Sequence, residues 1–168
     1  DLESRESRQI TRGDHQRQAV WEDNTHILYK TTELDEAMRA RGFEEEWTVY
    51  HRLNVCTGEE SEAFRLPMSV SGLWKMDEGR YVFTGETHLD RPNLLELTGE
   101  ALEKELVRRQ QTKGYKVLTE LPLCENGVGM FNQTRITLFL YLEATGEYRR
   151  ITPEDLSLIH ISEPTRPI

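Results

Sequence analysis

The chain has 168 residues, a net charge of −9 at pH 7 and 36% hydrophobic residues, which is enough apolar material for one ordinary globular domain. This acidic balance argues against a generic nucleic-acid-binding surface, because such binding needs clustered lysine and arginine. No stretch approaches the roughly 20 apolar residues of a membrane-spanning helix, so we expect no membrane association.

The chain divides into a polar lead-in over residues 1–20, one α+β domain over residues 21–155 and a tail over residues 156–168. The lead-in carries no apolar segment typical of a signal peptide, so we predict poor order there and a cytoplasmic protein. The tail, LSLIHISEPTRPI, resembles the translation of a transposase sequencing adapter. That resemblance implies that the tail is not native and that the authentic domain continues past Asp155. The alternative is a short strand followed by a proline-rich end.

The first half of the domain predicts a strand, a short helix and another strand. Residues 25–30 are the first strand candidate. Residues 32–42 predict a helix that begins at the N-cap Thr32 and ends at Gly42. Residues 46–55 alternate in polarity and predict a strand with one buried and one wet face. The predicted buried face holds Trp47, Val49, His51, Leu53 and Val55, and the wet face holds Thr48, Tyr50, Arg52 and Asn54.

A hairpin follows a loop predicted for residues 57–63. Its strands are residues 66–76 and 80–87, and Gly79 supplies the left-handed residue of the turn between them. Gly72 interrupts the first strand, which indicates a β-bulge or a close approach of another group.

Residues 93–113 predict the main helix, around which the other elements are expected to pack. Acidic residues open it and basic residues close it, which suits the helix dipole. Its apolar stripe consists of Leu95, Leu102 and Leu106. Gly114 is expected to end the helix, and a buried strand over residues 116–123 is expected to follow.

The most apolar strand candidate spans residues 135–143 (RITLFLYLE), after a turn at residues 125–127. Leu138 and Leu140 share one of its faces, and Phe139 and Tyr141 share the other. Because both faces are apolar, this strand should lie centrally in its sheet.

This element order favours an α+β fold, with a largely antiparallel sheet and two helices packed on one face. In each half a helix ends at glycine, at Gly42 and Gly114, before an aromatic residue and a strand. The halves are therefore interpreted as possible relatives of ferredoxin-like β-α-β-β units. A strongly curled sheet or half-barrel is the alternative architecture.

His88 and Asp90 form the sharpest short motif. Residues two apart in a strand share a face, so an imidazole and a carboxylate could bind one metal together. The motif resembles the His-x-Asp of iron- and 2-oxoglutarate-dependent oxygenases, and the resemblance implies an Fe(II) site completed by a later histidine. After His88 the sequence offers His160, which falls within the adapter-like tail, so the site is incomplete. The alternative is a strand end, with Asp90 opening the turn before Pro92.

Other reactive residues have structural interpretations. Cys56 and Cys124 form no Cys-x-x-Cys pair, so we predict buried thiols, with a single disulfide as the alternative. His51 lies in phase with apolar residues, which favours a core histidine with a satisfied hydrogen bond over a catalytic base.

Two functions of different class follow. The aromatic strands and the lack of a complete catalytic set favour a non-catalytic binding or assembly module. It would use an exposed sheet face or edge for a protein partner or for self-association, and it needs no cofactor. The alternative is an oxygenase-like enzyme that uses Fe(II) or another divalent metal at His88 and Asp90.

Overall fold

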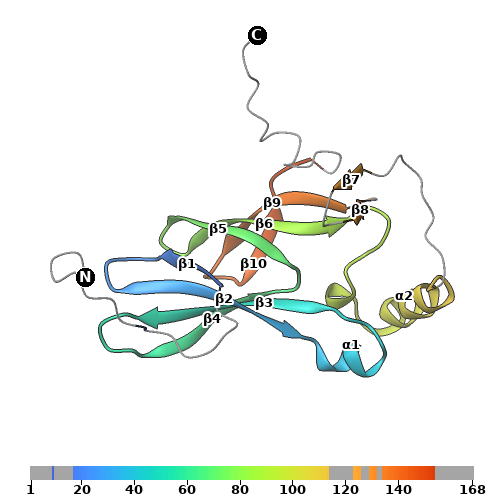
Figure 1. Ribbon diagram of the computed structural model, residues 1–168, viewed down its shortest axis with the longest axis horizontal. Helices are drawn as coiled ribbons and strands as arrows, with labels where there is room; N and C mark the ends of the chain where they lie inside the picture. Colours follow the sequence, from blue (N-terminus) through green and yellow to red (C-terminus); the bar gives the residue numbers. More distant parts are fainter. Residues whose placement is uncertain (1–8, 10–16, 114–122, 126–128, 132–133, 154–168) are drawn as a thin grey trace, which may run out of the picture.

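The computed structural model describes residues 9, 17–113, 123–125, 129–131 and 134–153. Two four-stranded antiparallel sheets face each other (Figure 1). Sheet A has the order β1 (Arg17–Trp21), β2 (His26–Leu34), β3 (Glu46–Asn54), β4 (Glu60–Leu66). Sheet B has the order β10 (Glu147–Arg150), β9 (Thr134–Leu142), β6 (Arg80–His88), β5 (Val70–Asp77). A short pair, β7 (Leu123–Glu125) and β8 (Gly129–Phe131), forms a third sheet.

The helices lie together at one end of the molecule (Figure 1). They are α1 (Glu36–Ala40), the 3₁₀ helix η1 (Leu94–Glu96) and α2 (Gly99–Gln111). Met38 of α1 packs with Leu94 and with Leu106 of α2 in a cluster of their own. No helix in the described part of the chain is long and apolar enough to cross a lipid bilayer.

The antiparallel sheets and the small number of helices confirm the predicted pairing pattern, but the layering differs from the prediction. The inner faces of the sheets cover each other, so the apolar stripe of α2 packs against α1 and η1 rather than across a sheet face. The described strands form no closed barrel.

α1 lies at the tip of a hairpin. β2 and β3 pair antiparallel along their whole length, from His26 opposite Asn54 to Leu34 opposite Glu46. A ferredoxin-like half needs a helix that crosses over between parallel strands. The β2-α1-β3 segment therefore gives no support to the predicted ferredoxin-like halves.

The first predicted helix begins later than the sequence suggested, and the second is divided in two. Thr32 belongs to β2, and the N-cap of α1 is Asp35, whose carboxylate accepts a hydrogen bond from the Met38 N–H at 2.9 Å. Gly42, with φ of 84°, follows α1 as predicted. The main helix is divided into η1 and α2, because Leu97 and Thr98 are extended between them. The predictions for Gly114 and for a strand before Leu123 lie outside the described residues.

The loop predicted for residues 57–63 is wrong over most of its length, because β4 begins at Glu60 and pairs with β3. β4 is an edge strand of sheet A. Its outward-facing charges, such as Glu62 and Arg65, blunt the edge and make the sequence read as a loop. Its inward-facing Phe64 and Leu66 are buried.

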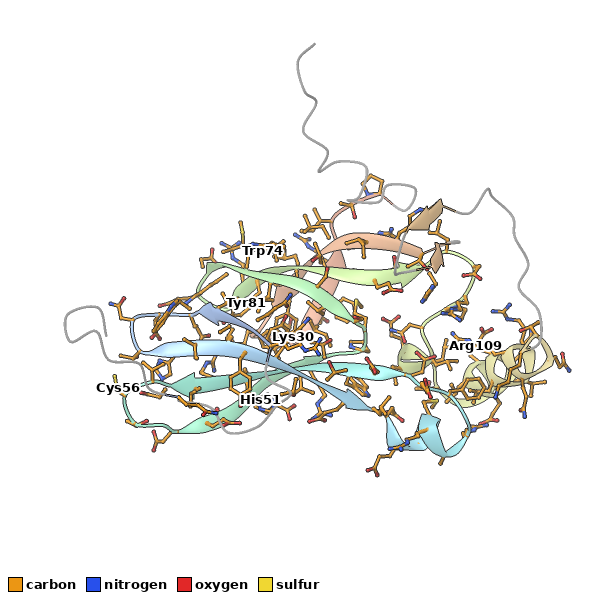
Figure 2. All side chains as sticks on the ribbon, viewed as in Figure 1. Lys30, His51, Cys56, Trp74, Tyr81 and Arg109 are labelled. Carbon is orange, nitrogen blue, oxygen red and sulfur yellow. The ribbon has the colours of Figure 1, made fainter. Side chains whose placement is uncertain are left out.

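The core between the sheets is aromatic. Phe64 stacks on Tyr141 with 4.4 Å between ring centroids, and Phe83 stacks on Phe139 at 5.1 Å. Each such pair adds about 0.5–1.5 kcal/mol beyond area burial. Figure 2 shows Tyr81 within this layer. β9 lies between β6 and β10, so the predicted central position of residues 135–143 is confirmed.

The face of β3 predicted to be wet is the face that meets sheet B. Thr48 is 2% exposed, and its hydroxyl donates to the Met68 carbonyl at 2.8 Å and accepts from the Val70 N–H at 3.3 Å. It thereby holds the connection from sheet A to sheet B. Tyr50 is fully buried on the same face. Polarity alone cannot distinguish a hydrated residue from a buried residue with satisfied hydrogen bonds, so the prediction of a wet face was wrong.

An ion-pair network closes the end of the core away from the helices. Arg52 donates to Glu22 at 2.5 and 2.6 Å and to Glu143 at 2.8 Å. The Tyr81 hydroxyl donates to Glu22 at 2.5 Å. Burial raises the pKa of Glu22, but the bonds from Arg52 and Tyr81 outweigh it and leave that pKa below its ordinary value.

Candidate functional site

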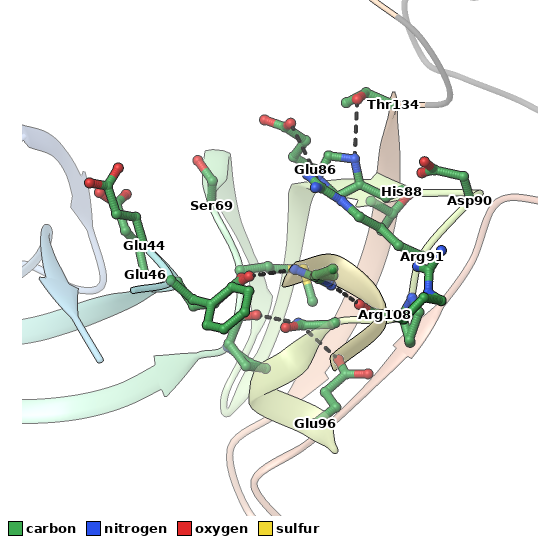
Figure 3. A pocket seen from close by; sticks show the side chains of 18 of the residues that line it. Glu44, Glu46, Ser69, Glu86, His88, Asp90, Arg91, Glu96, Arg108 and Thr134 are labelled. Atoms are coloured by element: carbon green, nitrogen blue, oxygen red, sulfur yellow. Dashed lines mark hydrogen bonds and ion pairs between the residues drawn. The ribbon is translucent and has the colours of Figure 1, made fainter. Parts of the chain in front are cut away.

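A groove of about 1410 Å³ opens at the helical end of the molecule (Figure 3). It is bounded by the loop after α1, the end of β6, the segment before η1, and α2. Met68, Phe139 and Tyr148 give it an apolar floor. A concave surface that combines apolar side chains with a few convergent polar groups is the usual form of a ligand site.

Glu44 and Glu46 line one side of the groove. Figure 3 shows both carboxylates across the groove from His88 and Arg91. No ion pair joins either glutamate to another described residue. This side therefore presents negative charge that the described chain does not neutralise.

His88 and Arg91 lie on the other side. Arg91 Nη2 lies 3.0 Å from His88 Nε2, and Thr134 Oγ1 lies 3.2 Å from His88 Nδ1. Because a guanidinium can only donate, Nε2 is the acceptor and Nδ1 carries the proton. Glu86 and Asp90 lie nearby: the Glu86 carboxylate is 3.9 Å from His88 Nε2, and Asp90 contributes to the raised pKa of Arg108, after the larger effect of Glu105.

Arg109 connects the two sides. Its side chain is 12% exposed, and it donates to Glu45 at 2.7 Å, to the Pro92 carbonyl at 2.6 Å and to Glu105 at 3.0 Å. Glu45 lies between the two glutamates of the acidic side, and Pro92 follows Arg91. One guanidinium therefore fixes α2 to both walls of the groove. The bonds from Arg108 and then Arg109 hold the pKa of Glu105 below its ordinary value despite its burial.

The predicted metal pair, His88 and Asp90, lines this same groove. His88 ends β6, whereas Asp90 lies in the bend that follows, so the two residues do not share a strand face. A metal at His88 Nε2 would have to displace the Arg91 guanidinium. Within the described residues, no three His, Cys, Asp or Glu side chains are placed to hold a metal ion. The Fe(II) or other divalent-metal site stays a prediction.

The outer face of sheet B, directed away from sheet A, carries a group of apolar residues among polar ones such as Arg80 and Thr84. Trp74 of β5, Val82 of β6 and Leu140 of β9 form one row across three neighbouring strands. Leu138 and Leu142 extend the row along β9. Trp74 is 52% exposed, and Figure 2 shows it on the outer side of the sheet. These five residues are named the outer apolar face.

His51 has the side-chain hydrogen bond that the sequence favoured, but it lies outside the core between the sheets. It lies on the outer face of sheet A, where its ring stacks on Tyr29 at 5.2 Å between centroids. Its Nε2 lies 3.0 Å from Thr31 Oγ1, and its Nδ1 lies 3.7 Å from a Glu60 oxygen. The hydrogen bond at Nε2 and the stacked tyrosine ring account for this imidazole without a substrate.

Cys56 is exposed in the loop after β3 and forms no disulfide, so the prediction of a buried thiol is wrong for this residue. Cys56 is not buried, because β3 ends at Asn54 and Cys56 lies in the loop that follows. The side chain of Cys124 lies outside the described part of the chain.

The walls of the groove were missed from the sequence. Glu44, Glu46, Arg91 and Arg109 belong to no sequence motif. A usable signal was present: alternate residues at the start of a strand point the same way, which places Glu44 and Glu46 on one side and Glu45 on the other.

Comparison with known proteins supplies no relationship from which a function follows: no protein-family model matches this chain, and no curated protein sequence matches it.

Proposed function

We propose that this chain is a non-catalytic binding module that pairs with a second copy of itself through the outer apolar face. One observation carries the proposal: β9 has apolar side chains on both faces. Phe139 and Tyr141 point into the core, while Leu138, Leu140 and Leu142 are left half-buried on the outside. Antiparallel sheets usually keep their second face polar, and a contiguous exposed apolar surface marks an interaction site.

The charged residues beside this face suit a two-fold pairing. Glu147 and Arg149 lie two residues apart on β10 and so share its outer face. They pair with Leu142 and Leu140 of β9, respectively. Neither forms an ion pair with another described residue. A two-fold axis lets the glutamate of one copy approach the arginine of the other, which makes the surface self-complementary.

The test is the mass of the protein in solution as a function of concentration, measured by sedimentation velocity. The wild-type chain should shift from monomer to dimer as concentration rises, and Leu140→Glu should remain monomeric because it buries a charge at the centre of the contact. Val107→Glu is the matched control, since Val107 is an exposed apolar residue of α2 away from this face. A wild-type protein that stays monomeric throughout would overturn the proposal.

A metal-dependent enzyme remains the second candidate, because His88 and Asp90 both line the groove. Calorimetric titration with Fe(II) under anaerobic conditions, and with Mn²⁺, tests it directly. The candidate requires binding by the wild-type chain and loss of binding in His88→Ala. Titrations without heat in both metals would remove this candidate and leave the pairing proposal untouched.

A further inference from the structure

We propose that the groove at the helical end binds a small zwitterion with an amine at one end, a carboxylate at the other and an apolar body between them. The lining contains six acidic and six basic side chains, together with His88. A singly charged ligand could pair with only one of two groups, either Glu44 and Glu46 or Arg91. A ligand that is neutral overall but charged at both ends can compensate both walls at once.

The amine end belongs at Glu44 and Glu46. Both carboxylates are exposed and lack an ion-pair partner among the described residues. A primary ammonium can donate to both of them, because it has several N–H groups and no preferred plane. Like charges held on one short segment also repel each other, and a bound cation relieves that repulsion.

The carboxylate end belongs at Arg91. Its guanidinium uses one edge to donate to the neutral His88 nitrogen at 3.0 Å, which leaves other N–H groups for a ligand. No described carboxylate forms a hydrogen bond with Arg91, although Glu86 and Asp90 line the same groove and the Glu86 carboxylate lies 3.9 Å from His88 Nε2. A guanidinium binds a carboxylate through paired N–H donors, which gives both strength and orientation.

The spacing of the two ends is built into the fold. Arg109 ties α2 to Glu45, within the acidic wall, and to Pro92, next to Arg91. Between the walls lie Met68 and Phe139, both buried at the floor. Fixed poles with an apolar floor select a ligand by its length, since one that is too short reaches only one pole.

Isothermal titration of the full chain with ω-aminododecanoate, dodecanoate and dodecylamine tests the proposal. The zwitterion should bind roughly tenfold or more tightly than either singly charged compound, the effect of one added hydrogen-bonded ion pair. Shorter ω-amino acids, ω-aminooctanoate and ω-aminohexanoate, should show a length optimum. Equal affinity for all three dodecyl compounds would mean binding by apolar contact alone, and would refute a two-ended site.

Charge reversal gives the sharper result. Glu44→Lys/Glu46→Lys should lose ω-aminododecanoate and gain dodecanedioate, because both poles are then basic. Glu59→Lys/Glu78→Lys makes the same charge change on exposed glutamates outside the groove and should leave the preference unchanged. Leu140→Glu should also bind the zwitterion normally, so failure of the pairing proposal would not be mistaken for failure of this one. An unchanged preference in the Glu44/Glu46 variant would reject the assigned amine pole.

Discussion

Gly72 and Gly85 leave space for a neighbouring side chain on opposite faces of sheet B. A Cβ at Gly85 would lie 2.5 Å from the sulfur of Met68, inside the core, so Gly85→Ala should lower the free energy of unfolding by about 1–3 kcal/mol. A Cβ at Gly72 would lie 2.5 Å from the indole of Trp74, which can swing into solvent, so Gly72→Ala should cost about 0.5 kcal/mol or less.

Urea unfolding measures both losses, and tryptophan fluorescence should shift to longer wavelength in Gly72→Ala. Trp74→Phe is the control background, in which that fluorescence shift must vanish. Comparable destabilisation by the two alanines would show that the indole is held as firmly as the core.

Removing the hydroxyl should change the free energy of unfolding in opposite directions at two buried tyrosines, Tyr50 and Tyr81. The Tyr50 hydroxyl has no hydrogen-bond partner among the described residues, so Tyr50→Phe removes an unsatisfied group and should raise the free energy of unfolding by about 1 kcal/mol. The Tyr81 hydroxyl donates to Glu22, so Tyr81→Phe should lower it by about 1.5–3 kcal/mol. Denaturant titration of the two variants measures both changes. Destabilisation by both substitutions would mean that the Tyr50 hydroxyl has a hydrogen-bond partner.

At the scale of elements, Arg109 connects α2 to two other segments of the chain. Arg109 reaches Glu45, Pro92 and Glu105, whereas Arg108 is 50% exposed and its described side-chain bonds go to Glu105. Arg109→Lys keeps the positive charge but loses the planar guanidinium that reaches several acceptors at once, so it should lower the free energy of unfolding by about 1–3 kcal/mol. Arg108→Lys should lower it by about 0.5 kcal/mol or less.

Hydrogen exchange locates this effect. Amides of α2 should exchange faster in Arg109→Lys, while those of the central strands β6 and β9 should keep their protection. Faster exchange across both sheets would mean that α2 stabilises the whole fold and does not unfold separately from it.

The sequence predicted the positions of those strands and turns that depend on local residue patterns. Alternation located β3, the hairpin turn at Gly79 located β6, and a run of apolar residues located β9, while Gly42 marked a helix end. On the inner face of β3 the prediction failed because its polar residues have partners that are distant in sequence. Arg52 is an example: its carboxylates, Glu22 and Glu143, lie 30 and 91 residues away along the chain.

At the scale of the whole molecule, the arrangement of two facing sheets could not be read from element order, since a helix between two strands fits both a crossover and a hairpin tip. The groove could not be predicted from the sequence either. Its walls come from segments near Glu44, Arg91 and Arg109, which only the folded chain brings together. The His88–Asp90 motif was found by residue type, and the structure places it in that groove without testing its metal chemistry.

The buried tyrosines predict a cooperative loss of structure at high pH. Burial, reinforced by hydrogen bonds to glutamates at Tyr29, Tyr81 and Tyr148, raises the pKa of these phenols and of Tyr50 above the ordinary value. A folded-state pKa raised in this way stabilises the fold fully below about pH 10, and this stability is lost as the pH rises further, because the unfolded chain releases protons that the folded chain keeps.

Phenolate absorbance and circular dichroism, followed together during alkaline titration, check this prediction. The two signals should change in one coincident transition above about pH 10. Gradual appearance of phenolate with unchanged circular dichroism would show that these hydroxyls reach solvent in the folded state.

The chain passes from sheet A to sheet B through the short connection between Leu66 and Val70. All of sheet A is therefore synthesised before the first strand of sheet B. At synthesis rates of about 5–20 residues per second, the aromatic face that includes Tyr50 and Phe64 remains exposed for several seconds until sheet B is complete. We expect a nascent sheet A to be the species that chaperones must protect. The speed of translation, as well as the stability of the finished fold, then determines how much native protein a cell recovers.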